Sequence, residues 1–445
     1  MLIRFTVSNF LSFKDETEFN MLTGDVKRHP HHVYKREHID VLRAAAIYGA
    51  NGAGKSNLIH AIAFLKYILE GDDILKTRQN FRLSNEYKNR PSELEIELEI
   101  KGITYAYGIE FDNKKINKEW LYKINFKNDE KDEMIFERET DDSLKHTLKL
   151  ADKYLKTDKE RYFVEFYKDE IIKPNFSFCS LVEQKEKYEE IYSVYSWFKE
   201  NLFLLRPDAK VATLIHDIEI EEYSDWFNSV INSLDTGIKR VYAEDFKPDK
   251  AFDKKNEVIK ESLKEDKDLR TFFMEGGNYF GARLENGEVA YKILICEHKN
   301  EDNQSIAFHA SDESDGTQKL LDIIPILWNI KENDFVFIID EIDRSIHPSL
   351  LKTFIKLLME MKKSKGQIIF TTHESNLLDL DIFRQDEIWF AEKNKEGATQ
   401  FYSLADFKPR YDLDIRKGYL NGRFGAIPFL GDLEKLNLNH HAETE

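Results

Sequence analysis

One short stretch, YGANGAGKSN from Tyr48 to Asn57, constrains the fold more than any other feature of the sequence. It follows the pattern G-x-x-x-x-G-K-[ST], whose fixed positions are Gly49, Gly54, Lys55 and Ser56. A short apolar run, residues 44–47, precedes it, and apolar residues at helical spacing follow from Asn57 to Glu70. A glycine loop between a strand and a helix surrounds phosphate oxygens with backbone N–H groups. The sequence therefore predicts an α/β fold with a phosphate site.

Each position of this loop has an expected task. Lys55 would reach the β- and γ-phosphates of a nucleotide, and the Ser56 hydroxyl would bind Mg²⁺. A chance glycine turn is the alternative, which the flanking strand and helix disfavour. We assign cofactor binding to the loop residues Gly49, Asn51, Gly52, Ala53, Gly54, Lys55, Ser56 and Asn57.

A pair of carboxylates ends the apolar run DFVFIID. Asp340 and Glu341 would lie at the carboxyl edge of a sheet, where open α/β sheets bind ligands. Asp340 is the candidate magnesium ligand, through water, and Glu341 the candidate base for an attacking water. A helix over Pro348–Met361 and a strand over Gln367–Thr371 follow, which indicates a parallel sheet. On its own, an Asp-Glu pair is usually a solvated pair.

Two further motifs flank this strand. In ESDGTQKLLDIIPIL, Ser314 and Gly316 precede an apolar helix whose N-terminus could bind an anion. The chain already has one phosphate loop, which suggests that this second anion site completes the nucleotide site of a partner chain. The alternative is that Ser314 is an ordinary helix N-cap. His373 follows the strand IIFTT, where its imidazole could contact a γ-phosphate, although a lone His is more often structural.

In this order the four motifs resemble an ABC-type ATPase head, and the opening IRFTVSNFLSFKD resembles its RecF and SMC-like branch. The resemblance implies ATP and Mg²⁺ as cofactors, Gln318 beside Ser314 and Gly316 in the signature loop, Asp343 in the D-loop, and His373 as the switch histidine. The signature departs from the common LSGGQ in having Asp315 and Thr317. The resemblance also implies a Q-loop glutamine near the metal. Gln184 is the candidate, with an ordinary surface glutamine as the alternative.

Further segments, including YSWFKENL and RKGYLNGRFGAIPFL, resemble a bacterial family of stand-alone SMC-like ATPases from phage-defence operons. The ATPase subunit of the PARIS system belongs to it, and the OLD and Septu ATPases are relatives. This resemblance implies a homo-oligomer with head-to-tail ATP sites, a phage-encoded trigger and a separate effector protein, for which a Toprim nuclease is one candidate. The stretch after His373 is too short for an appended Toprim domain.

The rest of the chain predicts the architecture around the motifs. Two strands open it, about Ile3–Ser8 and Glu16–Met21, and period-two segments over Glu93–Glu139 predict an antiparallel meander. Amphipathic helices without strict heptads exclude a long coiled coil. These helices are expected at Tyr188–Leu205, Ile218–Leu234 and Asn256–Phe273. The expected domains are ATPase lobe I over 1–180, a mainly helical insert over 181–305 and ATPase lobe II over 306–445.

Composition narrows the partners and the compartment. A formal net charge of −17 disfavours a general nucleic-acid coat, because that binding depends on clustered Lys and Arg. A local basic groove stays open, and with it a RecF-like DNA-repair ATPase that acts directly on DNA. Cys179 and Cys296 are the only cysteines and form no CxxC pair, which suits the cytoplasm. No run is apolar enough for a membrane span.

A histidine-rich segment, RHPHHVYKRE over Arg28–Glu37 with His38 directly after it, has two interpretations. Closely spaced histidines can bind a metal, but no carboxylate or cysteine stands at ligand spacing beside them. We therefore expect a solvated loop here.

Overall fold

The computed structural model describes residues 1–126, 131–182, 187–209, 214–247, 259, 261, 263, 271–285, 288–411 and 413–427. The chain divides into two compact units: unit 1 comprises Met1–Leu202 and Ile369–Glu445, and unit 2 comprises Phe203–Ile368. The second division falls inside the strand Gln367–Thr371. No helix in the described part of the chain is long and apolar enough to span a membrane.

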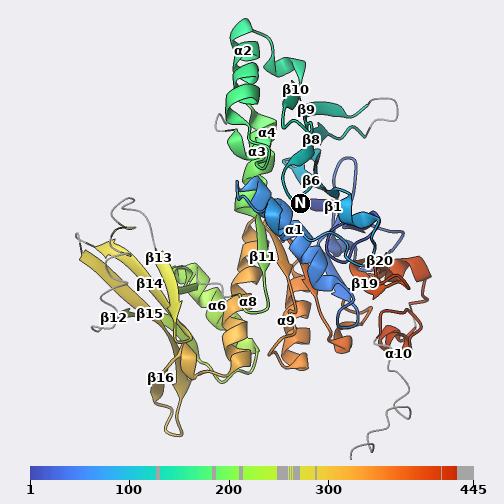
Figure 1. Ribbon diagram of the computed structural model, residues 1–445. Helices are drawn as coiled ribbons and strands as arrows, with labels where there is room; N and C mark the ends of the chain where they lie inside the picture. Colours follow the sequence, from blue (N-terminus) through green and yellow to red (C-terminus); the bar gives the residue numbers. More distant parts are fainter. Residues whose placement is uncertain are drawn as a thin grey trace, which may run out of the picture. The chain divides into compact units, whose positions relative to one another are not determined.

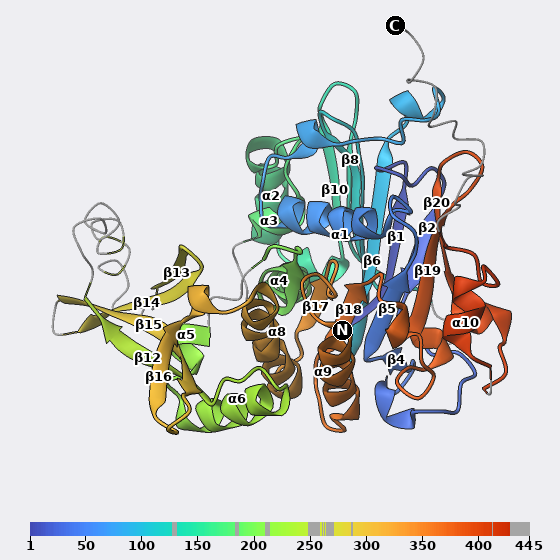
Figure 2. The same ribbon diagram turned by 90° about the horizontal axis from the view of Figure 1, so that it is seen from below.

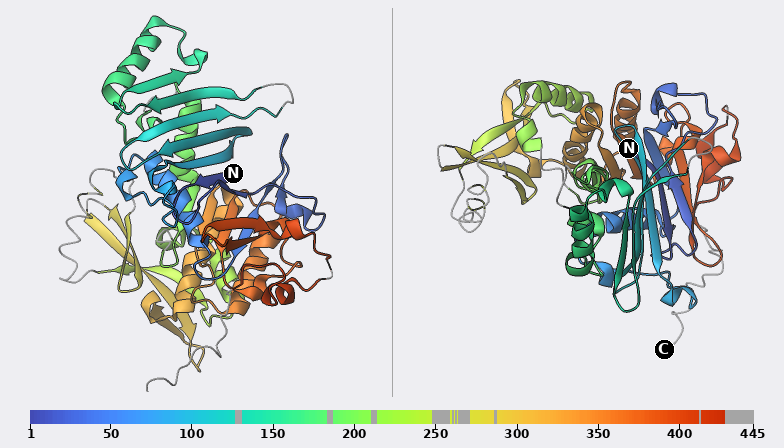
Figure 3. Two further views of the ribbon diagram at one scale, coloured as in Figure 1. Left: turned by 45° about the vertical axis from the view of Figure 1, so that its right-hand side comes forward. Right: turned by 90° about the horizontal axis from the view of Figure 1, so that it is seen from above.

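A seven-stranded antiparallel sheet, in the order β10-β9-β8-β7-β6-β1-β2, forms one layer of unit 1 (Figure 3). Successive side chains of a strand point to opposite faces of the sheet, so the strands can direct apolar residues into a core. Phe5 of β1 pairs with Ile96 of β6, and both side chains are buried. The two opening strands and the meander predicted from the sequence are confirmed, and β10 is an additional strand. The strands are β1 (Leu2–Ser8), β2 (Thr17–Asn20), β6 (Ser92–Ile100), β7 (Ile103–Phe111), β8 (Ile116–Lys123), β9 (Glu133–Thr140) and β10 (His146–Leu150).

The second layer of unit 1 contains the glycine loop. Strand β5 (Ala44–Tyr48) pairs in parallel with β19 (Ile388–Lys393), and the Thr372 N–H donates to the Ile47 carbonyl, which places the end of β18 beside β5. Helix α1 crosses the antiparallel sheet (Figure 2), where its Phe64 ring stacks 5.2 Å from that of Phe111. The other elements of this layer are α1 (Lys55–Leu69), β18 (Gln367–Thr371), β20 (Thr399–Ser403), α10 (Ile415–Leu420) and the hairpin β3 (Val33–Tyr34) and β4 (Val41–Leu42).

A buried ion pair fastens a helical segment to this sheet. Glu119 of β8 accepts hydrogen bonds from the Ser177 hydroxyl (2.7 Å) and the N–H of Phe178 (2.8 Å), and lies 3.2 Å from Arg138. The predicted helix Tyr188–Leu205 is confirmed as far as Asn201, after which the chain is extended. The elements are α2 (Asp158–Phe166), α3 (Phe178–Leu181), α4 (Glu189–Ser196), the π-helical turns η5 (Tyr167–Ile171) and η6 (Trp197–Asn201), and β11 (Leu202–Leu205).

Unit 2 contains the remaining α/β elements. The Asp340 N–H donates to the Leu205 carbonyl and the Gln367 N–H to the Phe335 carbonyl, so β17 lies between β11 and the start of β18. All four residues of β17 are buried, as a strand inside a covered sheet requires. The predicted strand–helix–strand order is confirmed. Its elements are α8 (Asp315–Glu332), β17 (Val336–Ile339), α9 (Pro348–Glu360) and β18.

The described part of the insert in unit 2 combines helices with a sheet. Helix α6 packs on α8 through Trp226 and Trp328, whose rings lie 5.1 Å apart, and confirms the predicted helix Ile218–Leu234 (Figure 1). Of the expected helix Asn256–Phe273, residues 259, 261 and 263 are helical, strand β13 occupies the end from Thr271, and the other residues lie outside the described part of the chain. The five-stranded antiparallel sheet was not predicted. The described elements are α5 (Leu214–Asp217), α6 (Glu221–Ser233), β12 (Arg240–Phe246), β13 (Thr271–Glu275), β14 (Asn278–Glu285), β15 (Glu288–Lys299) and β16 (Ser305–His309).

The α/β fold with an antiparallel β subdomain is thus confirmed. The longest described helix, α8, has 18 residues, so the described part of the chain contains no long coiled coil.

Candidate functional site

The glycine loop joins β5 to α1, and its glycines are required by shape. Gly52 and Gly54 have φ values of 77° and 108°, a left-handed conformation that other residues adopt only with strain. A Cβ atom on Gly54 would lie 2.1 Å from Oγ1 of Thr399, and one on Gly49 would lie 2.5 Å from the Ala391 carbonyl oxygen. Substitution of either residue therefore requires the loop to move.

Lys55 and His373 meet beside this loop. The Lys55 side chain is 6% exposed, and its ammonium donates to the carbonyls of Gly49 (2.8 Å) and Ala50 (3.3 Å). Nε2 of His373 lies 3.1 Å from the same ammonium. A cation and an imidazole from residues far apart in the sequence are thereby brought to one point.

The other predicted loop residues differ in exposure. Asn51 and Gly52 are exposed, Ala53 is buried, and Ser56 and Asn57 are half-buried. The Ala53 N–H donates to the Ala50 carbonyl at 3.1 Å, which closes the turn before α1. The Ser56 hydroxyl belongs to the first turn of α1, as the magnesium assignment requires.

Two residues that the sequence did not single out hold the loop in place. The Thr399 hydroxyl lies 2.8 Å from both the Ala53 carbonyl oxygen and the Ser12 hydroxyl. Asn57 donates to the same Ser12 hydroxyl at 2.7 Å. Ser12 and Thr399 come from opposite ends of the chain, so a local motif carries no signal for them.

In unit 2, the predicted carboxylates stand where β17 ends. Asp340 is 7% exposed, and Glu341, half-buried, has a φ of 49°. A left-handed conformation is unusual for a residue other than glycine, and such strain gathers at functional sites. The Arg344 N–H donates to the Glu341 carbonyl at 3.0 Å and so begins the turn that contains Asp343.

The signature residues lie at the start of α8. Ser314 is exposed and caps the helix, because its hydroxyl accepts the Thr317 N–H at 3.2 Å. A Cβ atom on Gly316 would lie 2.8 Å from the Ser345 carbonyl oxygen, which brings the signature and the D-loop turn together. Gln318 donates to the Glu313 carbonyl at 3.0 Å. A cavity of about 180 Å³ opens here, lined by residues that include Asp315, Gln318, Lys319 and Ser345.

Gln184, the candidate Q-loop residue, lies outside the described residues.

The glycine loop between β5 and α1, with a histidine beside its lysine, is the arrangement of a P-loop ATPase. Residues 44–379 match the family described as "AAA domain, putative AbiEii toxin, Type IV TA system". This match covers more than half of the chain, and the chain belongs to that family. No curated protein matches the chain.

Solved SMC head domains resemble the chain at low identity. The head bound to the C-winged helix domain of ScpA shares 13% identity and a TM-score of 0.44, over 92% of this chain and 99% of that one. The Thermotoga maritima head shares 13% identity and a TM-score of 0.38, over 90% of this chain and 98% of that one. The Pyrococcus furiosus head with an extended coiled coil is bound to the C-terminal domain of ScpA. It shares 12% identity and a TM-score of 0.40, over 92% of this chain and 97% of that one. Likenesses this weak carry no inference about function.

Proposed function

We propose that this chain hydrolyses ATP in a Mg²⁺-dependent reaction and binds the β- and γ-phosphates at the glycine loop. The observation that carries the proposal is the position of Lys55. Its buried ammonium is held by the loop's own carbonyls beside His373, and phosphate oxygens could replace those carbonyls as acceptors. The N-terminus of α1 adds favourable electrostatics for an anion.

The acidic strand end supports the hydrolytic step. Mg²⁺ prefers oxygen ligands, so the Ser56 hydroxyl and, through water, the Asp340 carboxylate would hold the ion, which would neutralise phosphate charge. Gln184 is a further candidate ligand near the metal. Glu341 would accept a proton from water as the water oxygen bonds to the γ-phosphorus. The bond from that phosphorus to the β–γ bridging oxygen breaks, which gives ADP and phosphate. His373 would contact the γ-phosphate.

The signature supports composite sites between two copies of the chain. Ser314 is exposed at the N-terminus of a long helix, a place suited to an anion. Because unit 1 already supplies one phosphate loop, Ser314, Gly316 and Gln318 would serve the nucleotide of a second, head-to-tail copy. Asp343 would line the same interface.

In the cell, the ATPase would act as the sensor or scaffold of an anti-phage system in the cytoplasm, restraining a separate effector until a phage-encoded trigger appears. The family resemblance stated from the sequence supports this role. The net charge of −17 favours a protein partner over bulk DNA. The description of the family as a putative AbiEii toxin favours another role, in which the chain is itself a toxin. A RecF-like repair ATPase would instead need a basic surface for DNA.

Expression of this gene without its neighbours separates these roles, with growth and phage plating as the two readouts. We expect normal growth and no protection from the single gene, and protection only with the neighbouring genes. We also expect Lys55→Ala to abolish that protection. Growth arrest by the single gene would favour the toxin, and full protection by it would exclude an effector acting in trans.

A further inference from the structure

The histidine-rich segment is not a solvated loop. Residues Pro30–His32 form the 3₁₀ turn η1, and His32 is only 1% exposed. Nitrogen atoms of His29, His31 and His32 all lie within 4.8 Å of one another. The backbone of His29 has a φ of 50°, and its ring stacks on that of His32 with centroids 4.8 Å apart. Three imidazoles therefore converge within unit 1.

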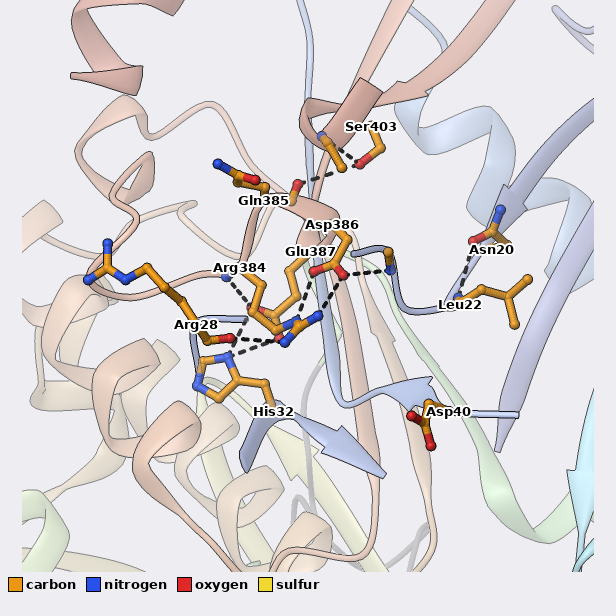
Figure 4. Close-up of polar contacts among 12 residues, drawn as sticks. Asn20, Leu22, Arg28, His32, Asp40, Arg384, Gln385, Asp386, Glu387 and Ser403 are labelled. Carbon is orange, nitrogen blue, oxygen red and sulfur yellow. Dashed lines mark hydrogen bonds and ion pairs between the residues drawn. The ribbon is translucent and has the colours of Figure 1, made fainter. Parts of the chain in front are cut away.

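A buried carboxylate orients the central histidine. Both carboxylate oxygens of Glu387 lie 3.0 Å from Nδ1 of His32, and the Glu387 side chain has no exposed surface (Figure 4). When Nδ1–H donates to this carboxylate, Nε2 carries the lone pair. Nε2 of His32 is buried and has no hydrogen-bond partner among the residues that the structure describes. In metal-binding histidines, one ring nitrogen commonly donates its hydrogen to a carboxylate, and the lone pair of the other nitrogen binds the metal.

The second histidine of the group, His29, also has a nitrogen that can carry a lone pair. Nε2 of His29 lies 2.9 Å from the Leu380 carbonyl oxygen and can only donate to it, which leaves the lone pair on Nδ1. His29 and His31 are half-buried, so one side of the cluster is open to solvent. Three nitrogens and one solvent position are the ligand set of an open tetrahedral zinc site.

The charges around the cluster are compatible with a cation. Arg384 is paired with Asp386 at 2.7 Å, and Arg43 donates to the His31 carbonyl at 2.9 Å. Zinc binds the neutral form of imidazole, and a bound cation would stabilise the ionised Glu387 carboxylate.

We propose that His29, His31 and His32 bind one Zn²⁺ ion, with Glu387 as a positioning residue on His32. Nitrogens bound to one tetrahedral zinc at 2.0–2.1 Å lie about 3.4 Å apart, so modest rotation of the half-buried rings closes the site. The ion would tie η1 to the turn η10 (Gln385–Glu387) before β19 and so stabilise unit 1. This proposal is independent of the ATPase assignment.

The test uses full-length, untagged protein without nucleotide, stripped with a chelator and then equilibrated with Zn²⁺. We expect one zinc per chain, a raised midpoint of thermal unfolding and, with Co²⁺ instead, the visible absorption of tetrahedral cobalt. The double variant His29→Ala/His31→Ala changes only half-buried rings and should fold but lose all three signals. Glu387→Gln should lower zinc affinity about 10–100-fold.

Two matched controls isolate the site. His38→Ala removes an exposed histidine of the same segment, and His440→Ala/His441→Ala removes the other close pair in the sequence. Both should keep one zinc per chain. Absence of zinc from the wild-type chain, or an unchanged zinc content in a folded His29→Ala/His31→Ala variant, would overturn the proposal.

Discussion

The ammonium of Lys55 lies 3.1 Å from Nε2 of His373, which joins the first turn of α1 to the second residue after β18. This pair makes distinct predictions for binding and for chemistry. Lys55→Ala should abolish measurable ATP binding, because the main cation of the phosphate loop is lost. His373→Ala should keep binding and lower kcat roughly 10²-fold, since it removes one group that stabilises transition-state charge. Nucleotide titration and steady-state kinetics distinguish the two, with the exposed His60→Ala of α1 as the control.

The Thr399 hydroxyl supports the loop from β20. Thr399→Val keeps the side-chain shape but leaves the buried carbonyl of Ala53 without this donor. We expect a loss of about 1–3 kcal/mol in the free energy of unfolding and a raised KM for ATP. Thr77→Val is the control, because its exposed hydroxyl also donates to a backbone carbonyl. An unchanged KM would show that the loop does not depend on Thr399.

The buried pair of Arg138 and Glu119 predicts a stability effect without loss of the site. Arg138→Ala leaves a buried carboxylate without its cation, which should cost about 3–5 kcal/mol. Lys149→Ala removes a partner of Glu137 from an exposed pair and should cost at most about 1 kcal/mol. Chemical denaturation measures both. Equal losses would contradict the assignment of Arg138 as an anchor.

Glu341 is the candidate base. Glu341→Gln should bind ATP with unchanged affinity and lower kcat by roughly 10²–10⁴-fold, because an amide cannot accept the proton of water. Glu360→Gln, at the exposed end of α9, should leave kcat unchanged. Turnover by Glu341→Gln at the wild-type rate would mean that another group activates the water.

The sequence predicted the parts of the site that are local. The strand, glycine loop and helix of β5 and α1 follow each other directly, so hydrophobic period and motif identify all three. Ser12 and Thr399 could not be found this way, because only folding brings them to Ala53. The same reason explains why the sequence wrongly predicted a solvated loop around His32. Its buried partner Glu387 comes from near the other end of the chain.

The insert was misjudged for a different reason. Strand β16 is exposed along its whole length, so core burial does not impose on it the alternation that identifies a half-buried strand. The core of this sheet depends on cross-strand neighbours instead, such as Phe280 opposite Ile293.

The central claim is that two copies of the chain complete each other's ATP site, and a mixing experiment tests it most directly. Ser314→Arg places a bulky cation at the exposed N-cap of α8, whereas Lys55→Ala disables the phosphate loop. Each variant alone should be inactive. A mixture should recover part of the ATPase activity, because each mixed dimer contains one site with both halves intact. No recovery, in a mixture shown to contain mixed dimers, would contradict the head-to-tail arrangement.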